Sequence, residues 1–166
     1  MSGSATGTGN IFEFNGHYYE AVRVDVWDST QNPAGGDHAT ISSLASQSNF
    51  QGFDGHLVTI TSQEENDFVL SLLQTEDSGW YYLGGSDHAV EGSFIWDQGP
   101  EAGGALTYTN WWPDQGGALS GGYPEPGSFS GSPYGEEDAM AMHNTLAASD
   151  GNAGYWFDIR DYTGSY

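Results

Sequence analysis

The sequence predicts an α+β domain with two helices in its first half and antiparallel sheets in its second half. Two segments with helical spacing of apolar residues occur early, whereas from Gly79 onward short apolar runs alternate with turn residues. The chain has 25 glycines and no cysteine, which indicates many turns and long loops without disulfides. At 166 residues it is long enough for one domain with a single core.

The N-terminal part is expected to contain a linker followed by a hairpin. Residues 1–10 consist largely of Gly, Ser and Thr and are predicted to be a linker, so that the domain comprises residues 11–166. Asn15-Gly16 is a strong signal for a two-residue hairpin turn. The segment from Tyr19 to Val26 has the apolar residues expected of a strand.

Two helices are predicted from their N-terminal signals. Asp37 is expected to cap the first helix, whose apolar face carries Ile41, Leu44 and Ala45. Gly55 to Ile60 is a short strand candidate that precedes the second helix. This helix begins at Ser62, which with Glu65 forms a capping-box pattern. Its buried stripe is expected to comprise Phe68, Val69, Leu72 and Leu73.

The second half is predicted to consist of strands around one long loop. The strand candidates are Trp80 to Leu83, Gly92 to Trp96, Leu106 to Trp111, Ala139 to His143 and Tyr155 to Ile159. Gly116 to Gly135 has no periodicity and carries three prolines. A loop of that length in a compact domain is usually functional or disordered.

The charge is extreme, with 23 acidic residues against two arginines and a formal net charge of −21. This surface repels phosphate backbones, so nucleic acid is not expected as a partner. Self-repulsion of this size disfavours compaction unless cations neutralise it, as a high-salt medium or extracellular calcium would. It also favours a monomer. No apolar run reaches the roughly 18 residues of a membrane span.

Carboxylates stand beside the long loop and its flanking strands. Glu125 lies within the loop, Glu137 and Asp138 precede one strand candidate, and Asp158 lies in another. Carboxylate oxygens that converge from a loop and neighbouring strands suit Ca²⁺, which takes six to eight oxygen ligands. The sequence therefore predicts a calcium-organised binding site, in which metal takes over the role that disulfides would play.

Six segments in order resemble the C-type lectin-like domain over most of the chain, from Tyr18 to Ile159. They are Gly55 to Val69, Tyr82 to Asp87, Glu91 to Trp96, Thr109 to Trp111, Glu137 to Ala139 and Trp156 to Asp158. The chain looks like the cysteine-free type found in large bacterial surface adhesins, because Ala139 stands where the family has a disulfide cysteine.

The resemblance implies two calcium sites. The sugar-binding site would use Glu125, Glu137 and Asp158 as side-chain ligands, and Ser128 would take the place of a missing ligand. Gly127 and Phe157 replace two amide ligands of the family, so we expect a weaker site. The family also has a cis peptide bond at the position of Glu125-Pro126.

The second, structural calcium site would use Asp87 and Glu91 on one side and Glu137 and Asp138 on the other. An alternative alignment of the loop places Gln115-Gly116-Gly117 at the sugar-binding motif. The glycines there supply no ligand, so Glu125 is preferred.

Several aromatic residues are candidates for ligand contact. Strand alternation predicts that one of Trp111 and Trp112 points into the core and the other toward the loop. If Trp112 points outward, it would either stack on a sugar ring or pack against other side chains. Tyr123 lies on the loop itself and is a further candidate. The Gly- and Ser-rich segment from Gly127 to Gly131 lacks the strand and helix that a nucleophile elbow needs, and no nucleophile–base pair is found, so no enzymatic activity is expected.

These expectations combine into a calcium-dependent lectin module of a bacterial cell-surface adhesin. Glu at position 125 favours glycans of the mannose, glucose or fucose class on host or neighbouring cells, as the family resemblance implies. The module is expected to be extracellular, monomeric and part of a larger protein. The alternative is a module that keeps calcium for structure only and binds a protein, a peptide or ice.

Overall fold

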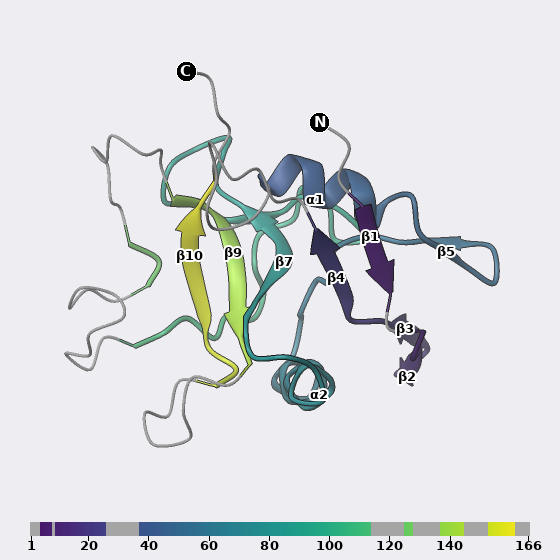
Figure 1. Ribbon diagram of the computed structural model, residues 1–166. Helices are drawn as coiled ribbons and strands as arrows, with labels where there is room; N and C mark the ends of the chain where they lie inside the picture. The colour runs from purple at the N-terminus through teal and green to yellow at the C-terminus, as the bar shows by residue number, and fades with distance from the viewer. Residues whose placement is uncertain are drawn as a thin grey trace.

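A computed structural model describes residues 4–7, 9–25, 37–113, 125–127, 137–144 and 153–161 of the chain. These residues form two helices and four antiparallel sheets, which confirms the predicted α+β class (Figure 1). The largest sheet has the strand order β10-β9-β7-β8. Its strands are β7 (Trp80–Ser86), β8 (Ile95–Trp96), β9 (Glu137–His143) and β10 (Trp156–Arg160).

One face of this sheet packs against helix α2 to form the core. Side chains alternate across a strand, so Met140 and Met142 of β9 share a face with Trp156 of β10 and Leu83 of β7. These four side chains are fully buried. Helix α2 contributes its apolar stripe to the same cluster, namely Val69, Leu72 and Leu73, with Phe68 packed against it. The predicted buried face of α2 is thus confirmed.

The two helices begin where their capping signals place them. In α1 (His38–Ala45) the Asp37 carboxylate accepts a hydrogen bond from the Thr40 N–H at 2.7 Å. In α2 (Gln63–Leu73) the Ser62 hydroxyl accepts from the Glu65 N–H at 3.2 Å. The return bond of a capping box is absent, because the Glu65 carboxylate accepts from the Thr61 N–H at 2.8 Å instead. The same carboxylate also accepts from the Tyr19 hydroxyl.

Three two-stranded sheets complete the described part of the chain. The predicted Asn15-Gly16 hairpin joins β2 (Phe12–Phe14) and β3 (His17–Tyr19), with both turn residues at positive φ. A second hairpin joins β5 (Asn49–Phe50) and β6 (Phe53–Asp54). Strand β4 (Val22–Asp25) pairs with β1 (Ser4–Gly7), a strand inside the segment predicted to be a linker. The domain boundary itself stays a prediction.

Three predicted strands differ from the structure. Gly55 to Ile60 is not a strand, although the Val58 carbonyl accepts one backbone hydrogen bond from Gly84. In the segment from Leu106 to Trp111, only Trp111 pairs, through an isolated bridge to Trp156. The strand predicted from Gly92 to Trp96 is shorter in the structure and consists of β8 alone. Apolar runs mark burial as well as strand pairing, and these segments pack on the core without a full ladder. Conversely, β7 continues through Gly84 and Gly85 to Ser86.

Candidate functional site

Asp158 is a carboxylate buried in the middle of β10 without hydrogen bonds to either oxygen. Its side chain is only 5% exposed. Burial raises the pKa of Asp158 to about 10, and the nearby negative charges of Asp87, Glu137, Glu125 and Glu91 add to this effect. These four carboxylates, all of them predicted site residues, are therefore near enough to act on Asp158 electrostatically. A cation placed there would offset both the burial and the repulsion.

Glu125 reaches this point from the loop. Its backbone N–H donates a hydrogen bond to the Trp112 carbonyl at 3.1 Å, which links Glu125 to the segment that precedes the long loop. Its Oε2 accepts hydrogen bonds from the backbone N–H groups of Gly127 at 3.2 Å and Asp158 at 3.4 Å. The expected cis peptide bond between Glu125 and Pro126 is present. Burial raises the pKa of the Glu125 carboxyl, and the two backbone hydrogen bonds act against that rise.

Asp87 and Glu137 approach Asp158 from the ends of two neighbouring strands. Asp87 follows β7 and is 2% exposed; its Oδ2 accepts from the Gly92 N–H at 2.7 Å, whereas its Oδ1 is buried without a hydrogen-bond partner. Glu137 begins β9 and lies 3.8 Å from the Arg160 guanidinium. Burial raises the pKa of both carboxyls, and Arg160 lowers that of Glu137.

Asp138 lies beside a histidine, and its role as a ligand of the second calcium stays a prediction. Its Oδ2 lies 3.2 Å from His88 Nδ1, and His88 Nε2 lies 2.7 Å from Asp161 Oδ2. Asp161 is 2% exposed and also accepts from the His38 N–H at 2.9 Å. Sequence reasoning missed Asp161, because it belongs to no motif and meets His38 and His88 only through the fold.

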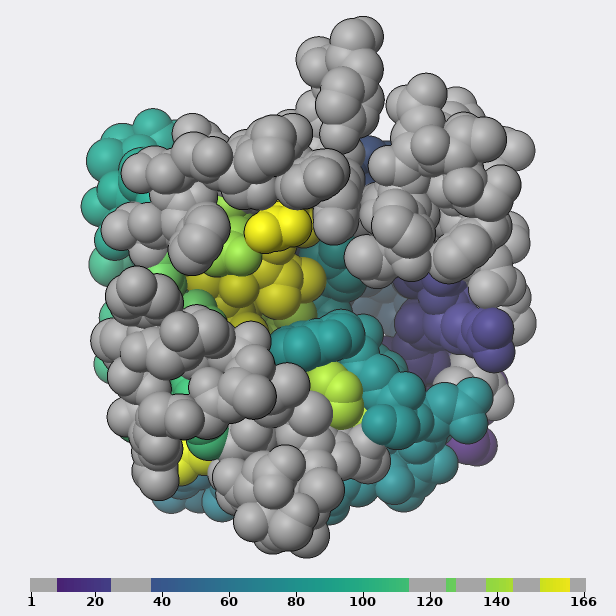
Figure 2. Space-filling model, turned by 60° about the vertical axis from the view of Figure 1, so that its left-hand side comes forward, coloured from purple at the N-terminus to yellow at the C-terminus, as the bar shows by residue number. Residues whose placement is uncertain are grey.

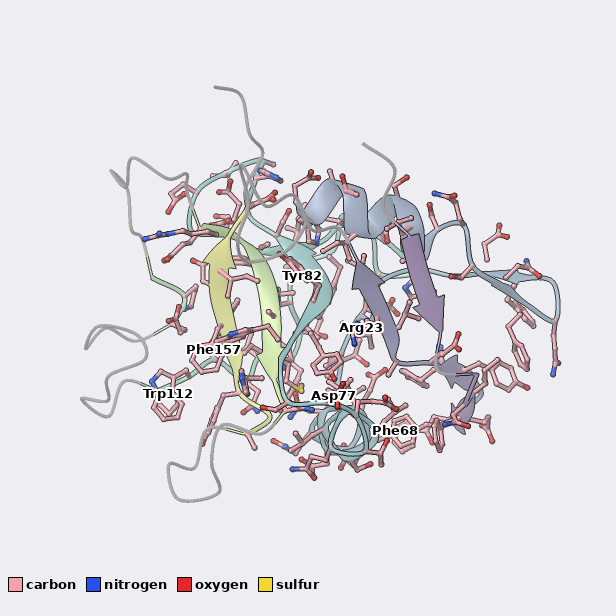
Figure 3. All side chains as sticks on the ribbon, in the orientation of Figure 1. Arg23, Phe68, Asp77, Tyr82, Trp112 and Phe157 are labelled. Atoms are coloured by element: carbon pink, nitrogen blue, oxygen red, sulfur yellow. The ribbon has the colours of Figure 1, made fainter. Side chains whose placement is uncertain are left out.

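The two tryptophans at the start of the loop contact successive residues of β10, Trp156 and Phe157, and so lie on opposite faces as strand alternation predicts, although Trp112 is buried. Trp111 packs on the core cluster, with its ring 5.9 Å from that of Trp156. Trp112 is 5% exposed and lies between Tyr155 and Phe157, with its ring stacked on Phe157 at 6.0 Å (Figure 3). A sugar contact by Trp112 stays a prediction, and Tyr123 and Ser128 lie outside the described residues.

The chemistry of these donors fits a hard divalent cation, although the described side chains do not close a coordination shell. Three carboxylate oxygens of Asp87 and Asp158 are buried without partners. Buried unpaired carboxylates are costly unless a metal or a counter-charge accompanies them. Across residues 37–113, 125–127, 137–144 and the other described ranges, however, no group of three or more His, Cys, Asp or Glu side chains is placed to hold a metal.

Comparisons with known proteins point to one family. The family model described as Lectin C-type domain matches residues 42–123. The Alpha-N-acetylgalactosamine-specific lectin of Patiria pectinifera is 40% identical over 60 residues, which are 34% of this chain and 33% of that protein. Halomucin of Haloquadratum walsbyi is 30% identical over 154 residues, or 93% of this chain but 1% of that protein. The chain thus spans a third or less of these two relatives.

A solved structure supports the same fold. The EPNH mutant of CEL-I superposes with a TM-score of 0.52 at 17% sequence identity. The match covers 96% of this chain and 82% of that one. At this level of identity the likeness concerns the fold.

Proposed function

We propose that this chain is a C-type lectin-like domain that acts as a calcium-dependent carbohydrate-binding module. The observation that carries the proposal is the buried Asp158, whose two oxygens have no hydrogen-bond partner and whose negative charge is disfavoured by the charges of four further carboxylates. A binding site for a cation is the simplest reason to bury such a group.

The residues that would hold the sugar-binding calcium are Glu125, Glu137 and Asp158. When bound, Ca²⁺ would supply coordination positions for two vicinal hydroxyl groups of a sugar. The carboxylates would accept hydrogen bonds from the same hydroxyls, and bonds to charged acceptors are stronger than neutral ones. Backbone hydrogen bonds from Gly127 and Asp158 orient the Glu125 carboxylate for this task. Asp87, Glu91 and Asp138 would serve a second, structural calcium.

The sugar class follows from Glu125. A Glu at this position is similar to the family pattern for mannose-like sugars, so we propose ligands of the mannose, glucose or fucose class. The name of the Patiria pectinifera lectin specifies N-acetylgalactosamine, which supports a carbohydrate ligand in general. We place the module outside the cell, in a larger adhesive protein of a bacterial surface. No described helix is long and apolar enough to cross a membrane.

A glycan array with and without excess chelator tests the proposal. Wild type is expected to bind mannose-, glucose- or fucose-type glycans only with calcium. The Glu125→Gln and Asp158→Asn variants should lose this binding, whereas Glu64→Gln on the exposed surface of α2 should keep it. Glycan binding by the two site variants at the wild-type level would refute the assignment of the site.

A module for protein, peptide or ice is the second candidate, with calcium used for structure only. Two observations favour this second candidate. Phe157 stands where the family has an amide ligand, and Trp112 is buried against Phe157 rather than exposed to a ligand. A calcium-dependent rise in melting temperature without any signal on the glycan array would support this candidate over the lectin.

A further inference from the structure

The chain has almost no basic residues, and one of them stands beside the acidic site. Arg23 and Arg160 are its two arginines and it has no lysine, against 23 acidic residues. Arg23 lies in β4, which belongs to a separate two-stranded sheet (Figure 3). Arg160 is the last residue of β10, the strand that carries Asp158. One of the two permanent cations of the chain is therefore placed next to the predicted calcium ligands.

A register shift in the main sheet places Arg160 opposite Glu137. Ile159 of β10 pairs with Ala139 of β9, but the next residue of β10, Arg160, pairs with Glu137. Asp138 is therefore the extra residue of a β-bulge. Bulges change where the neighbouring side chains point, and they occur often beside functional sites. In a regular ladder Arg160 would lie opposite Asp138, so the bulge decides which carboxylate receives the arginine.

The ion pair that results is partly exposed. Arg160 Nε lies 3.8 Å from Glu137 Oε1, and the two side chains are 35% and 25% exposed. In Figure 2 the yellow atoms of β10 reach the surface beside the yellow-green atoms of β9. A guanidinium keeps its proton at physiological pH, so the positive charge at this position is fixed. Ion pairs in contact with water are weak, so a divalent cation can displace this one.

We propose that Arg160 is a built-in counter-cation that holds Glu137 in the calcium-free domain and competes with calcium for this carboxylate. The inference rests on the proposed function, in which Glu137 is a ligand of the sugar-binding calcium. Arg160 stabilises the calcium-free domain because its charge offsets part of the repulsion among the carboxylates. By linkage, a contact that stabilises the calcium-free state lowers the affinity for calcium.

The competition predicts two changes of opposite benefit in the Arg160→Gln variant. The Tm in chelator should fall by about 1–4 °C, as expected for the loss of a surface ion pair in a domain of this size. The Kd for calcium should decrease about threefold to tenfold at physiological salt, because a positive charge beside the site has been removed. An arginine that served folding alone would lower the Tm without tightening calcium binding.

Calorimetric titration with CaCl₂ and thermal melting in chelator measure the two changes. Arg23→Gln is the matched control, because it removes the same charge from a different sheet. It should change the calcium Kd by less than about twofold, since the Debye length at physiological salt is about 8 Å. Melting is repeated in a Glu137→Gln background, where the partner of Arg160 is already neutral. There the Arg160→Gln substitution should lower the Tm by less than half as much.

Three results would overturn the proposal. The first is calcium binding by Arg160→Gln that is no tighter than that of the wild type. The second is equal tightening in Arg23→Gln, which would indicate an effect of net charge alone. The third is an equal loss of Tm with and without the Glu137 carboxylate. If neither the wild type nor Arg160→Gln binds calcium, the proposed function fails together with the competition, whereas the first result refutes the competition alone.

Discussion

The Asp158→Asn substitution is expected to stabilise the calcium-free domain and to abolish most of its response to calcium. Asn has nearly the shape of the protonated acid but needs no proton to become neutral. In the wild type, burial and neighbouring carboxylates raise the pKa of Asp158 from 3.8 to about 10. Each pKa unit corresponds to about 1.36 kcal/mol, so the difference between 3.8 and pH 7 corresponds to an upper limit of about 4 kcal/mol.

The raised pKa also sets the direction of the pH dependence. A carboxyl whose pKa is higher in the folded state stabilises the fold fully below its unfolded pKa and loses this contribution as pH rises through the folded pKa. For Asp158 the loss extends from about pH 4 to about pH 10. The stability difference between the Asn variant and the wild type should therefore grow over this range in chelator.

Thermal unfolding in chelator and in calcium measures both effects. At pH 7 in chelator, a gain of about 1–4 kcal/mol corresponds to a rise in Tm of about 2–4 °C per kcal/mol for a domain of this size. Calcium at a hundredfold excess over its Kd should stabilise the wild type by about 2.7 kcal/mol and the variant by much less.

Asp67→Asn, on the exposed face of α2, is the matched control and should change neither quantity. The reasoning is refuted if Asp158→Asn fails to raise the Tm in chelator or keeps the full calcium shift.

Three further predictions concern the core, a turn and the net charge. Asn66 is 2% exposed, accepts from Trp156 Nε1 at 2.8 Å and donates to the Gly154 carbonyl. Asn66→Ala should therefore cost about 2–4 kcal/mol in urea unfolding, and a loss below about 1 kcal/mol would contradict this role. Gly154 has φ of +82°, and an added Cβ would lie 2.8 Å from Leu70 Cδ2. Gly154→Ala should cost about 1–3 kcal/mol by the same assay, and an unchanged midpoint would show that the turn relaxes. With a formal charge of −21, the domain in chelator should melt at higher temperature in 1 M than in 0.1 M NaCl, and a Tm independent of salt would argue against self-repulsion.

The elements predicted from local signals agree with the structure. The Asn15-Gly16 turn, the Asp37 cap and the Ser62 cap each depend on residues within a few positions of one another. Strand predictions were less successful because a strand exists only where a partner lies beside it. Leu106 to Trp111 is buried against the core, yet pairs at a single bridge.

The candidate site was predictable in part for the same reason. Motif order along the chain selected Glu125, Glu137 and Asp158, and in the structure the charges of Asp87 and Glu91 also act on Asp158. The packing of Trp112 on Phe157 and the role of Asp161 depend on contacts across the fold, which no motif recorded. The occupation of the site by calcium stays a prediction.

The sequence by itself determined the α+β class, both helix starts, the hairpin turn and the acids that flank the loop, because each depends on composition or on neighbouring residues. Only the tertiary structure decided that Asp158 is buried near other predicted site carboxylates and that Asp161 meets His38 and His88. Both features arise where segments far apart along the chain converge. The free energies of burial and of charge repulsion depend on those distances in space rather than on separation along the chain.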